Sequence, residues 1–193
     1  MPVQRTAIEG LLVLRFEPAT DERGFFRQAF QLGELEDALG REVRLRQGNH
    51  ARSAPGVIRG FHAEPWDKLV HVTRGTVLAA VADIRPDHGT FGEVATFLLG
   101  DHPGEQAALF VAEGLANAYG VRGDEPADYV YEVSREWAAT ADKRAVAWDD
   151  PDLAVDWGIE VPAVSAADRA NPTLRQRFPH HPRWRDGTSD QRR

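Results

Sequence analysis

Residues 55–72 read PGVIRGFHAEPWDKLVHV, a stretch in which two apolar runs enclose charged side chains. Two apolar runs, residues 56–62 and 68–73, are predicted strands. The charged or titratable side chains placed between or within them include Arg59, His62, Glu64 and Lys68. Because an unpaired charge is costly to bury, a strand pair of this composition indicates a site at which those groups act.

Short strands continue on both sides of this stretch. They are predicted at residues 11–16, 25–30, 43–48, 76–84, 94–99, 108–111, 116–121, 129–134 and 146–148. Glycine- and proline-rich turns separate them. One sizeable helix is predicted at residues 31–39 with Gly40 as its C-cap, and one helical turn follows Ser165 as N-cap. Many short strands without helices between them are typical of a β-sandwich or barrel.

Length and composition indicate one soluble domain. The chain has 193 residues, which is enough for a single core, and we expect residues 1–178 to form it. Residues 179–193 contain almost no apolar side chains and are predicted to be a mobile tail.

The net charge of −7, with no basic block, argues against a nucleic-acid partner. No segment has the length and apolarity of a signal peptide or a membrane span, so a cytoplasmic protein without a membrane partner is expected.

The absence of cysteine excludes disulfides, thiolate metal sites and a cysteine nucleophile. No nucleotide-cofactor fingerprint is present, and no cofactor is predicted. A metal site built from His62, Glu64 and His71 is the alternative to consider, because metals need several such ligands. Asn117 and Tyr119 stand where a further ligand is expected, so no metal site is predicted.

Three side chains of the opening stretch suit acid–base chemistry on a phosphorylated substrate. His62 titrates near neutral pH and can take or give a proton. Lys68 can stabilise negative charge that develops on a substrate oxygen. Arg59 can bind phosphate through paired hydrogen bonds. Taken one at a time, each is better explained as a structural or solvated side chain. Their grouping within one short stretch, between two apolar runs, shifts the balance toward a functional site.

Further motifs extend along nearly the whole chain. In order they are DERGFF (21–26), QGN (47–49), GVIRGFH (56–62), KLV (68–70), VADIR (81–85), TFG (90–92), WDDP (148–151) and AVDW (154–157). This series resembles the dTDP-4-dehydrorhamnose 3,5-epimerases, from about residue 10 to residue 178.

The resemblance implies a mostly β protein with a cupin-type jelly-roll β-sandwich or barrel and a few short helices. It implies a homodimer that shares an N-terminal strand, and catalysis without a metal. The implied substrate is a nucleoside-diphosphate 4-keto-6-deoxyhexose, such as dTDP-4-dehydro-6-deoxyglucose. C3, C5 or both are inverted by proton removal and return through an enolate.

The resemblance also assigns roles to individual residues. His62 matches the base, and Asp168 matches the aspartate that orients its ring. Lys68 matches the residue near the ketone oxygen, and Tyr131 matches the acid on the opposite face. From the residues alone, Asp168 would be a solvated acid in a helical turn and Tyr131 a half-buried strand aromatic.

The matched nucleotide-binding positions are Arg23, Phe26, Gln47, Asn49 and Arg59. Of these, the resemblance implies that Arg23 and Phe26 reach the site of the partner subunit.

Three positions depart from the family pattern. Asn117 replaces a histidine and cannot carry a proton charge. Gln28 replaces a glutamate of the nucleotide site, and Trp137 replaces a tyrosine that lines the sugar pocket. These changes leave open an epimerase of one carbon, an isomerase of a related sugar nucleotide, or a binding protein without catalysis. A metal-dependent cupin oxygenase or isomerase is a further alternative.

Overall fold

The computed structural model describes residues 2–139 and 144–184. Its elements are β1 (Val3–Arg5), β2 (Leu11–Arg15), β3 (Ala19–Asp21), β4 (Gly24–Phe26), α1 (Leu32–Leu39), β5 (Gln47–Ser53), β6 (Ile58–Ala63), β7 (Lys68–Arg74), β8 (Thr76–Asp83), β9 (Val94–Gly100), β10 (Ala107–Val111), β11 (Leu115–Arg122), β12 (Ala127–Val133), β13 (Arg144–Ala145), α2 (Ala166–Arg169), α3 (Leu174–Arg177) and a 3₁₀ helix, Pro182–Trp184. No helix in these two ranges is long and apolar enough to cross a membrane.

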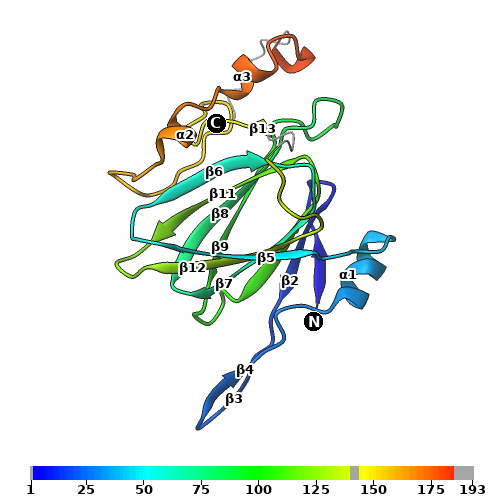
Figure 1. Ribbon diagram of the computed structural model, residues 1–193, viewed down its shortest axis with the longest axis vertical. Helices are drawn as coiled ribbons and strands as arrows, with labels where there is room; N and C mark the ends of the chain where they lie inside the picture. The colour runs from blue at the N-terminus through cyan, green and yellow to red at the C-terminus, as the bar shows by residue number, and fades with distance from the viewer. Residues whose placement is uncertain (1, 140–143, 185–193) are drawn as a thin grey trace, which may run out of the picture.

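Two antiparallel sheets face each other (Figure 1). The six-stranded sheet has the order β1-β2-β10-β7-β12-β5, and the five-stranded sheet has the order β13-β6-β11-β8-β9. Apart from β1–β2 and β8–β9, neighbours in each sheet are not consecutive in the chain, as in a jelly roll. The two runs of the opening stretch therefore separate: β6 enters one sheet and β7 the other. The predicted mostly β, cupin-type architecture with a few short helices is confirmed.

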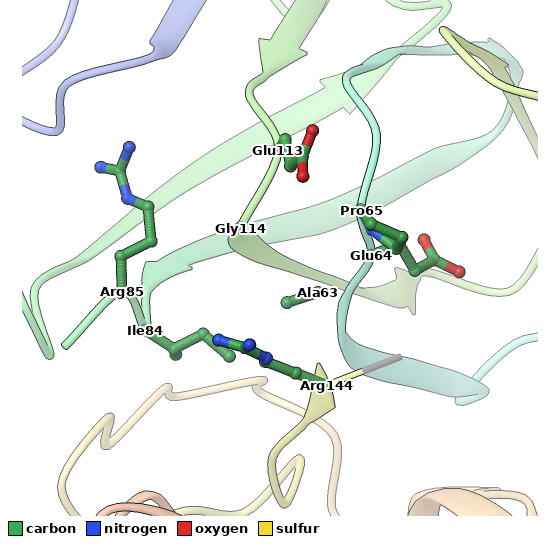
Figure 2. A pocket seen from close by; sticks show the side chains of 8 residues that line it. All are labelled: Ala63, Glu64, Pro65, Ile84, Arg85, Glu113, Gly114 and Arg144. Carbon is green, nitrogen blue, oxygen red and sulfur yellow. The ribbon is translucent and has the colours of Figure 1, made fainter. Parts of the chain in front are cut away.

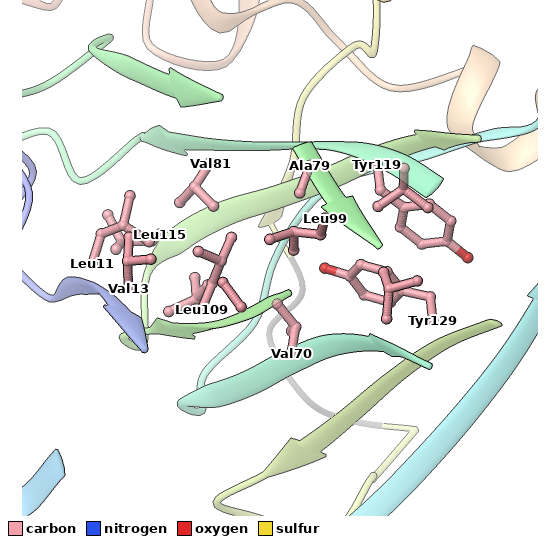
Figure 3. Close-up of a cluster of buried hydrophobic side chains, with 14 of the residues drawn as sticks. Leu11, Val13, Val70, Ala79, Val81, Leu99, Leu109, Leu115, Tyr119 and Tyr129 are labelled. Atoms are coloured by element: carbon pink, nitrogen blue, oxygen red, sulfur yellow. The ribbon is translucent and has the colours of Figure 1, made fainter. Parts of the chain in front are cut away.

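The main core lies between the sheets (Figure 3). It is built from aliphatic side chains that include Val70, Ala79, Val81, Leu99 and Leu109, all of them fully buried. Tyr119 and Tyr129 lie at one end of this core, where the apolar interior gives way to polar side chains. The site described below begins at that end.

Each sheet is also covered on its outer face. Helix α1 packs on the six-stranded sheet through Leu35, which contacts a cluster containing Leu12, Leu14 and Phe110. The segment after β13 covers the five-stranded sheet with another cluster. Burial on both faces explains why residues 11–14 are apolar without the alternation of a half-exposed strand.

Two predicted strands are wrong at their boundaries. The predicted strand at residues 25–30 ends at Phe26, because β3 and β4 form a separate hairpin that projects from the sheets (Figure 1). The predicted strand at 43–48 begins only at Gln47. Val43 instead packs beside α1, and its N–H donates to Glu36 at 2.8 Å.

The C-terminal region differs in detail from the sequence prediction. Of the predicted strand at 146–148, only Val146 is hydrogen-bonded to a neighbouring strand, in both directions with Phe61, while β13 precedes it. His181 stacks on Phe91 at 3.8 Å between ring centroids, and Trp184 contacts the same ring. His181 and Trp184 therefore contact the body of the protein, while Pro179, His180, Pro182 and Arg183 are exposed. The mobility of the tail stays a prediction. The rest of that predicted tail, residues 185–193, lies outside the described residues.

Two buried aspartates show why several of the quoted motifs matter to the fold. Asp83 has no exposed surface and accepts hydrogen bonds from Arg85 and Thr90. Asp150 accepts from the backbone N–H groups of Leu153 and Leu174, which ties the C-terminal segment together. These motif residues hold loops in place rather than taking part in chemistry.

Candidate active site

A cavity of about 130 Å³ opens between the two sheets at the polar end of the core. The side chains that line it are Ala51, Arg59, His62, Glu64, Lys68, Asn117, Tyr119, Tyr129 and Tyr131. They come from β5, β6, β7, β11 and β12 and from the loop that follows β6. Both walls of the sandwich therefore contribute polar groups to a single space.

An irregularity in β6 directs two of these side chains into the cavity. Opposite Tyr119 and Asn117 of β11, the β6 partners are Arg59 and His62, so β6 carries one extra residue between them. In a regular strand, residues three apart point to opposite faces. The β-bulge restores them to one face. A side chain at Gly60, within the bulge, would lie 2.6 Å from the Ala118 Cα, so glycine is required there.

His62 is held by a carboxylate from a distant part of the chain. Its Nε2 lies 2.6 Å from Oδ1 of Asp168, which is 7% exposed. Ser165 caps α2 by accepting from the N–H of Asp168, which fixes the position of that residue. Burial raises the pKa of Asp168, but hydrogen bonding to His62, Ser165 and the Gly60 backbone leaves the pKa below its usual value.

This geometry prepares His62 to accept a proton. An ionised Asp168 accepts hydrogen bonds only, so Nε2 of His62 donates to it. The other ring nitrogen then carries a lone pair, and the carboxylate stabilises the imidazolium that forms after proton uptake.

Lys68 forms an ion pair with Glu64 inside the cavity. The Lys68 side chain is 7% exposed, and its Nζ lies 6.0 Å from the centroid of the Tyr131 ring. A cation this deeply buried needs a partner, and the carboxylate provides one.

Three tyrosines form the other wall. Tyr119 and Tyr129 are stacked at 4.1 Å, and Tyr131 follows two residues later on the same face of β12. Burial raises the pKa of the Tyr131 phenol, and the Glu64 carboxylate raises it further. Burial also raises the pKa of Tyr119 and of Tyr129. All three phenols are therefore protonated at neutral pH and can donate a proton or a hydrogen bond.

Arg59 and Asn117 are each tied to one of these tyrosines. Nε of Arg59 donates to Oγ of Ser53 at 3.0 Å, and that oxygen lies 3.0 Å from the Tyr119 hydroxyl. The Tyr129 hydroxyl donates to Oδ1 of Asn117 at 3.2 Å. Asn117 thus occupies the cavity wall as a hydrogen-bonding side chain without charge.

The structure brings together only part of the predicted site. His62, Lys68, Tyr131 and Asp168 meet at the cavity, as do Arg59 and Asn117. The remaining predicted positions lie elsewhere in this chain: Gln47, Asn49, Trp137, Arg23, Phe26 and Gln28.

Those remaining positions form two groups. On β5, the side-chain amide of Gln47 donates to Oδ1 of Asn49. The side-chain oxygen of Gln47, Oε1, accepts from the backbone N–H of Trp137. The Trp137 side chain is 57% exposed and does not line the cavity. Arg23 and Phe26 are exposed on the projecting β3–β4 hairpin, and Gln28 is exposed just beyond it.

Sequence reasoning missed several lining residues. Tyr129 could have been predicted, because the period-two alternation of a strand places it on the same face as Tyr131. Ser53 and Tyr119 carry no local signal, because their contact with Arg59 depends on the β-bulge and on long-range pairing. For Glu64, the sequence suggests a specific role only as a metal ligand, and its contact with Lys68 follows from the structure.

A second cavity of about 150 Å³ lies behind Glu64 (Figure 2). Its walls include Arg85, Glu113 and Arg144, but it contains no histidine and no tyrosine. The Arg85 guanidinium is already paired with the buried Asp83. Figure 2 shows the Glu64 carboxylate turned away from Arg85. The cavity that contains His62 is therefore the candidate site.

The metal-site alternative does not fit this geometry. His62 is paired with Asp168, and Glu64 is paired with Lys68. His71 packs edge-on against Phe16, beyond β7 on its outer face. Within residues 2–139 and 144–184, no three histidine, aspartate or glutamate side chains are grouped to hold a metal ion.

Solved structures with a similar fold define the class of protein. NovW, a 4-keto-6-deoxy sugar epimerase from Streptomyces spheroides, matches with a TM-score of 0.87 and 28% identity, over 93% of this chain and 90% of NovW. ChmJ, a 3′-monoepimerase from Streptomyces bikiniensis in complex with dTDP-quinovose, matches with a TM-score of 0.81 and 28% identity, over 90% and 89%. The fold is that of a cupin-type sugar-nucleotide epimerase.

The sequence comparisons identify the family. The family model for dTDP-4-dehydrorhamnose 3,5-epimerase matches residues 5–176. The dTDP-4-dehydrorhamnose 3,5-epimerase of Shigella flexneri is 35% identical over 174 residues, which are 87% of this chain and 93% of that protein. The chain belongs to the dTDP-4-dehydrorhamnose 3,5-epimerase family, a family of isomerases that act on sugar nucleotides, and the resemblance is confirmed.

The position of His71 outside the site predicts a stability effect without loss of activity. Burial and the nearby Arg27 lower the pKa of His71 from 6.5 to about 4. The unfolded histidine therefore binds its proton first as the pH falls. The free energy of unfolding is highest above about pH 6.5, and His71 lowers it by up to about 3 kcal/mol as the pH falls to about 4.

We expect His71→Phe to make the free energy of unfolding less dependent on pH in this window, as measured by urea titration. Glu132, 4.0 Å from His71, and Arg27 are the charged neighbours that remain. The same change at the exposed His102 is the control. Equal pH slopes for His71→Phe and the wild-type protein would show that the buried histidine is not the titrating group.

Proposed function

We propose that this chain inverts C3, C5 or both in a nucleoside-diphosphate 4-keto-6-deoxyhexose, by general acid–base catalysis without a metal. The observation that carries the proposal is the arrangement of His62 and Tyr131 on opposite walls of one cavity. His62 belongs to the five-stranded sheet and Tyr131 to the six-stranded sheet. A sugar ring bound between them meets a base on one face and an acid on the other.

The reaction requires no change of oxidation state. His62 removes the proton from a carbon beside the C4 ketone, and the electrons of that C–H bond form a C=C bond. The ketone oxygen becomes an enolate oxygen, which the Lys68 ammonium stabilises. When the carbonyl re-forms, Tyr131 gives its phenolic proton to the opposite face of the same carbon, and the configuration is inverted.

Asp168 and Arg59 support these steps. Asp168 holds the His62 ring and balances the charge of the imidazolium. Arg59 lies at the edge of the cavity with part of its guanidinium committed to Ser53, and its remaining N–H groups suit a diphosphate. The nucleotide is then directed toward β5, where Gln47 and Asn49 are placed.

The substrate assignment combines this cavity with the relatives. The Shigella flexneri relative is a dTDP-4-dehydrorhamnose 3,5-epimerase, and the ChmJ structure contains dTDP-quinovose. A dTDP-sugar is therefore the first compound to test. Because ChmJ is a 3′-monoepimerase, the proposal covers inversion at one centre as well as at two.

The proposed homodimer explains the predicted residues that lie away from the cavity. Phe26 is 72% exposed and Phe25 is 54% exposed, which is unusual for neighbouring phenylalanines on a free hairpin. In the proposed dimer, this hairpin reaches the nucleotide site of the second copy. Arg23 and Phe26 would then act in trans, with Gln28 beside them.

His62→Ala tests the central role of the base. In heavy water, the wild-type protein should incorporate deuterium at C3, C5 or both of dTDP-4-keto-6-deoxyglucose. The variant should lose this exchange by roughly 10²- to 10⁴-fold, the usual cost of removing a general base. NMR of the product measures the exchange and identifies the inverted carbon. His102→Ala, at an exposed turn, is the control and should exchange at the wild-type rate.

Two outcomes would contradict the proposal. Exchange at the wild-type rate in His62→Ala would remove His62 from its assigned role. Nucleotide binding by the wild-type protein without any exchange would identify a binding protein rather than an epimerase.

Mixed dimers test the contribution in trans. Arg23→Ala and His62→Ala should each be nearly inactive alone, but co-expressed subunits should form a dimer with one intact site. Random pairing in a two-fold dimer predicts recovery of about a quarter of the wild-type activity. Differently tagged subunits allow the mixed species to be purified and assayed. No recovery in the purified mixed dimer would show that Arg23 serves its own subunit.

A further inference from the structure

The strongest feature of the cavity without an assigned role is Glu64. Its carboxylate pairs with Lys68, and its side chain is 17% exposed. It lines the cavity together with Tyr131, and it also forms the partition between this cavity and the one behind it. The Glu64 carboxylate therefore shares one cavity with Lys68 and Tyr131, two residues of the proposed reaction.

The backbone holds Glu64 and Lys68 at a fixed separation. Glu64 follows β6 directly, Lys68 begins β7, and only residues 65–67 lie between them. Asp67 anchors this short loop: its carboxylate accepts from the N–H of Glu113 at 3.0 Å and from Arg41 at 2.8 Å. The backbone N–H of Asp67 also donates to Ser134 at 3.0 Å. The ion pair is thus part of a rigid corner rather than a contact between mobile side chains.

The pair determines how Lys68 can act. An ammonium group has three N–H donors, and Glu64 takes one of them. This contact restricts the rotation of the lysine side chain and leaves the other donors for a ligand in the cavity. It also balances the charge of a cation whose side chain is buried in the cavity.

The same carboxylate influences the acid on the opposite wall. The charged and titratable groups that face Tyr131 are Arg59, His62, Glu64, Lys68, Tyr119 and Tyr129. Of these, Glu64 is the carboxylate, and its negative charge raises the pKa of Tyr131 in addition to burial. Removal of that charge therefore favours loss of the phenolic proton.

We propose that Glu64 is a positioning residue for the epimerase: it orients the Lys68 ammonium toward the ketone oxygen and places a negative charge in the same cavity as the Tyr131 phenol. This inference rests on the proposed function. It assigns to Glu64 an electrostatic role that acts through two other side chains, without contact with the reacting carbon.

Glu64→Gln tests the inference through the pH profile of kcat. Loss of the carboxylate should move the alkaline limb to lower pH by roughly one unit, because the Tyr131 phenol then loses its proton more readily. The value of kcat at neutral pH should fall about tenfold, while KM changes little, since the nucleotide contacts are intact. Glu64→Asp keeps the charge and should restore the position of the alkaline limb even if kcat is reduced.

Glu113→Gln is the matched control, because Glu113 lines the neighbouring cavity and does not contact Lys68. Its pH profile should equal that of the wild-type protein. If Glu64→Gln is less stable but keeps the wild-type alkaline limb, Glu64 is only structural and the inference is wrong. If the wild-type protein shows no deuterium exchange, the proposed function itself fails, and this inference fails with it.

Discussion

A polar cavity inside an apolar sandwich is stable only while its charges are paired, and the site of this protein depends on that constraint. Two contacts satisfy it: the hydrogen bond of His62 to the Asp168 carboxylate, and the ion pair of Lys68 with Glu64. Each contact joins two segments whose relative position matters to the reaction. The first ties the C-terminal segment to β6, and the second ties β6 to the start of β7. Electrostatic pairing and catalytic geometry are therefore provided by the same contacts.

The apolar framework places these pairs at the junction of the two sheets. Burial on both faces keeps the strands rigid, and the β-bulge in β6 is the local exception that brings Arg59 and His62 to one face. The base then projects from one sheet while Tyr131 projects from the other. The reaction removes a proton from one face of a sugar ring and adds a proton to the opposite face. Its stereochemistry follows from the placement of the base and Tyr131 on opposite walls.

Much of this architecture could be predicted from the sequence. The strand pattern predicted the mostly β fold, and the ordered motifs predicted the family and the group His62, Lys68, Tyr131 and Asp168. The boundaries at residues 25–30 and 43–48 were wrong because they depend on a separate hairpin and on packing against α1. The pairing of Glu64 with Lys68 was not predicted, because it depends on the geometry of the short loop between β6 and β7. The contact of Ser53 with Tyr119 was not predicted, since strands distant in the sequence bring these residues together. Trp137 was expected in the sugar pocket, but in this chain its side chain lies outside the cavity.

The central claim is that His62 acts as the base and Tyr131 as the acid. Tyr131→Phe in heavy water tests this claim most directly. Without the phenol, His62 can still remove a proton and return a deuteron to the same face. We expect the recovered 4-keto sugar nucleotide to contain deuterium with its original configuration, as read by NMR. Inversion at the wild-type rate, or loss of exchange as complete as in a protein without His62, would contradict the claim.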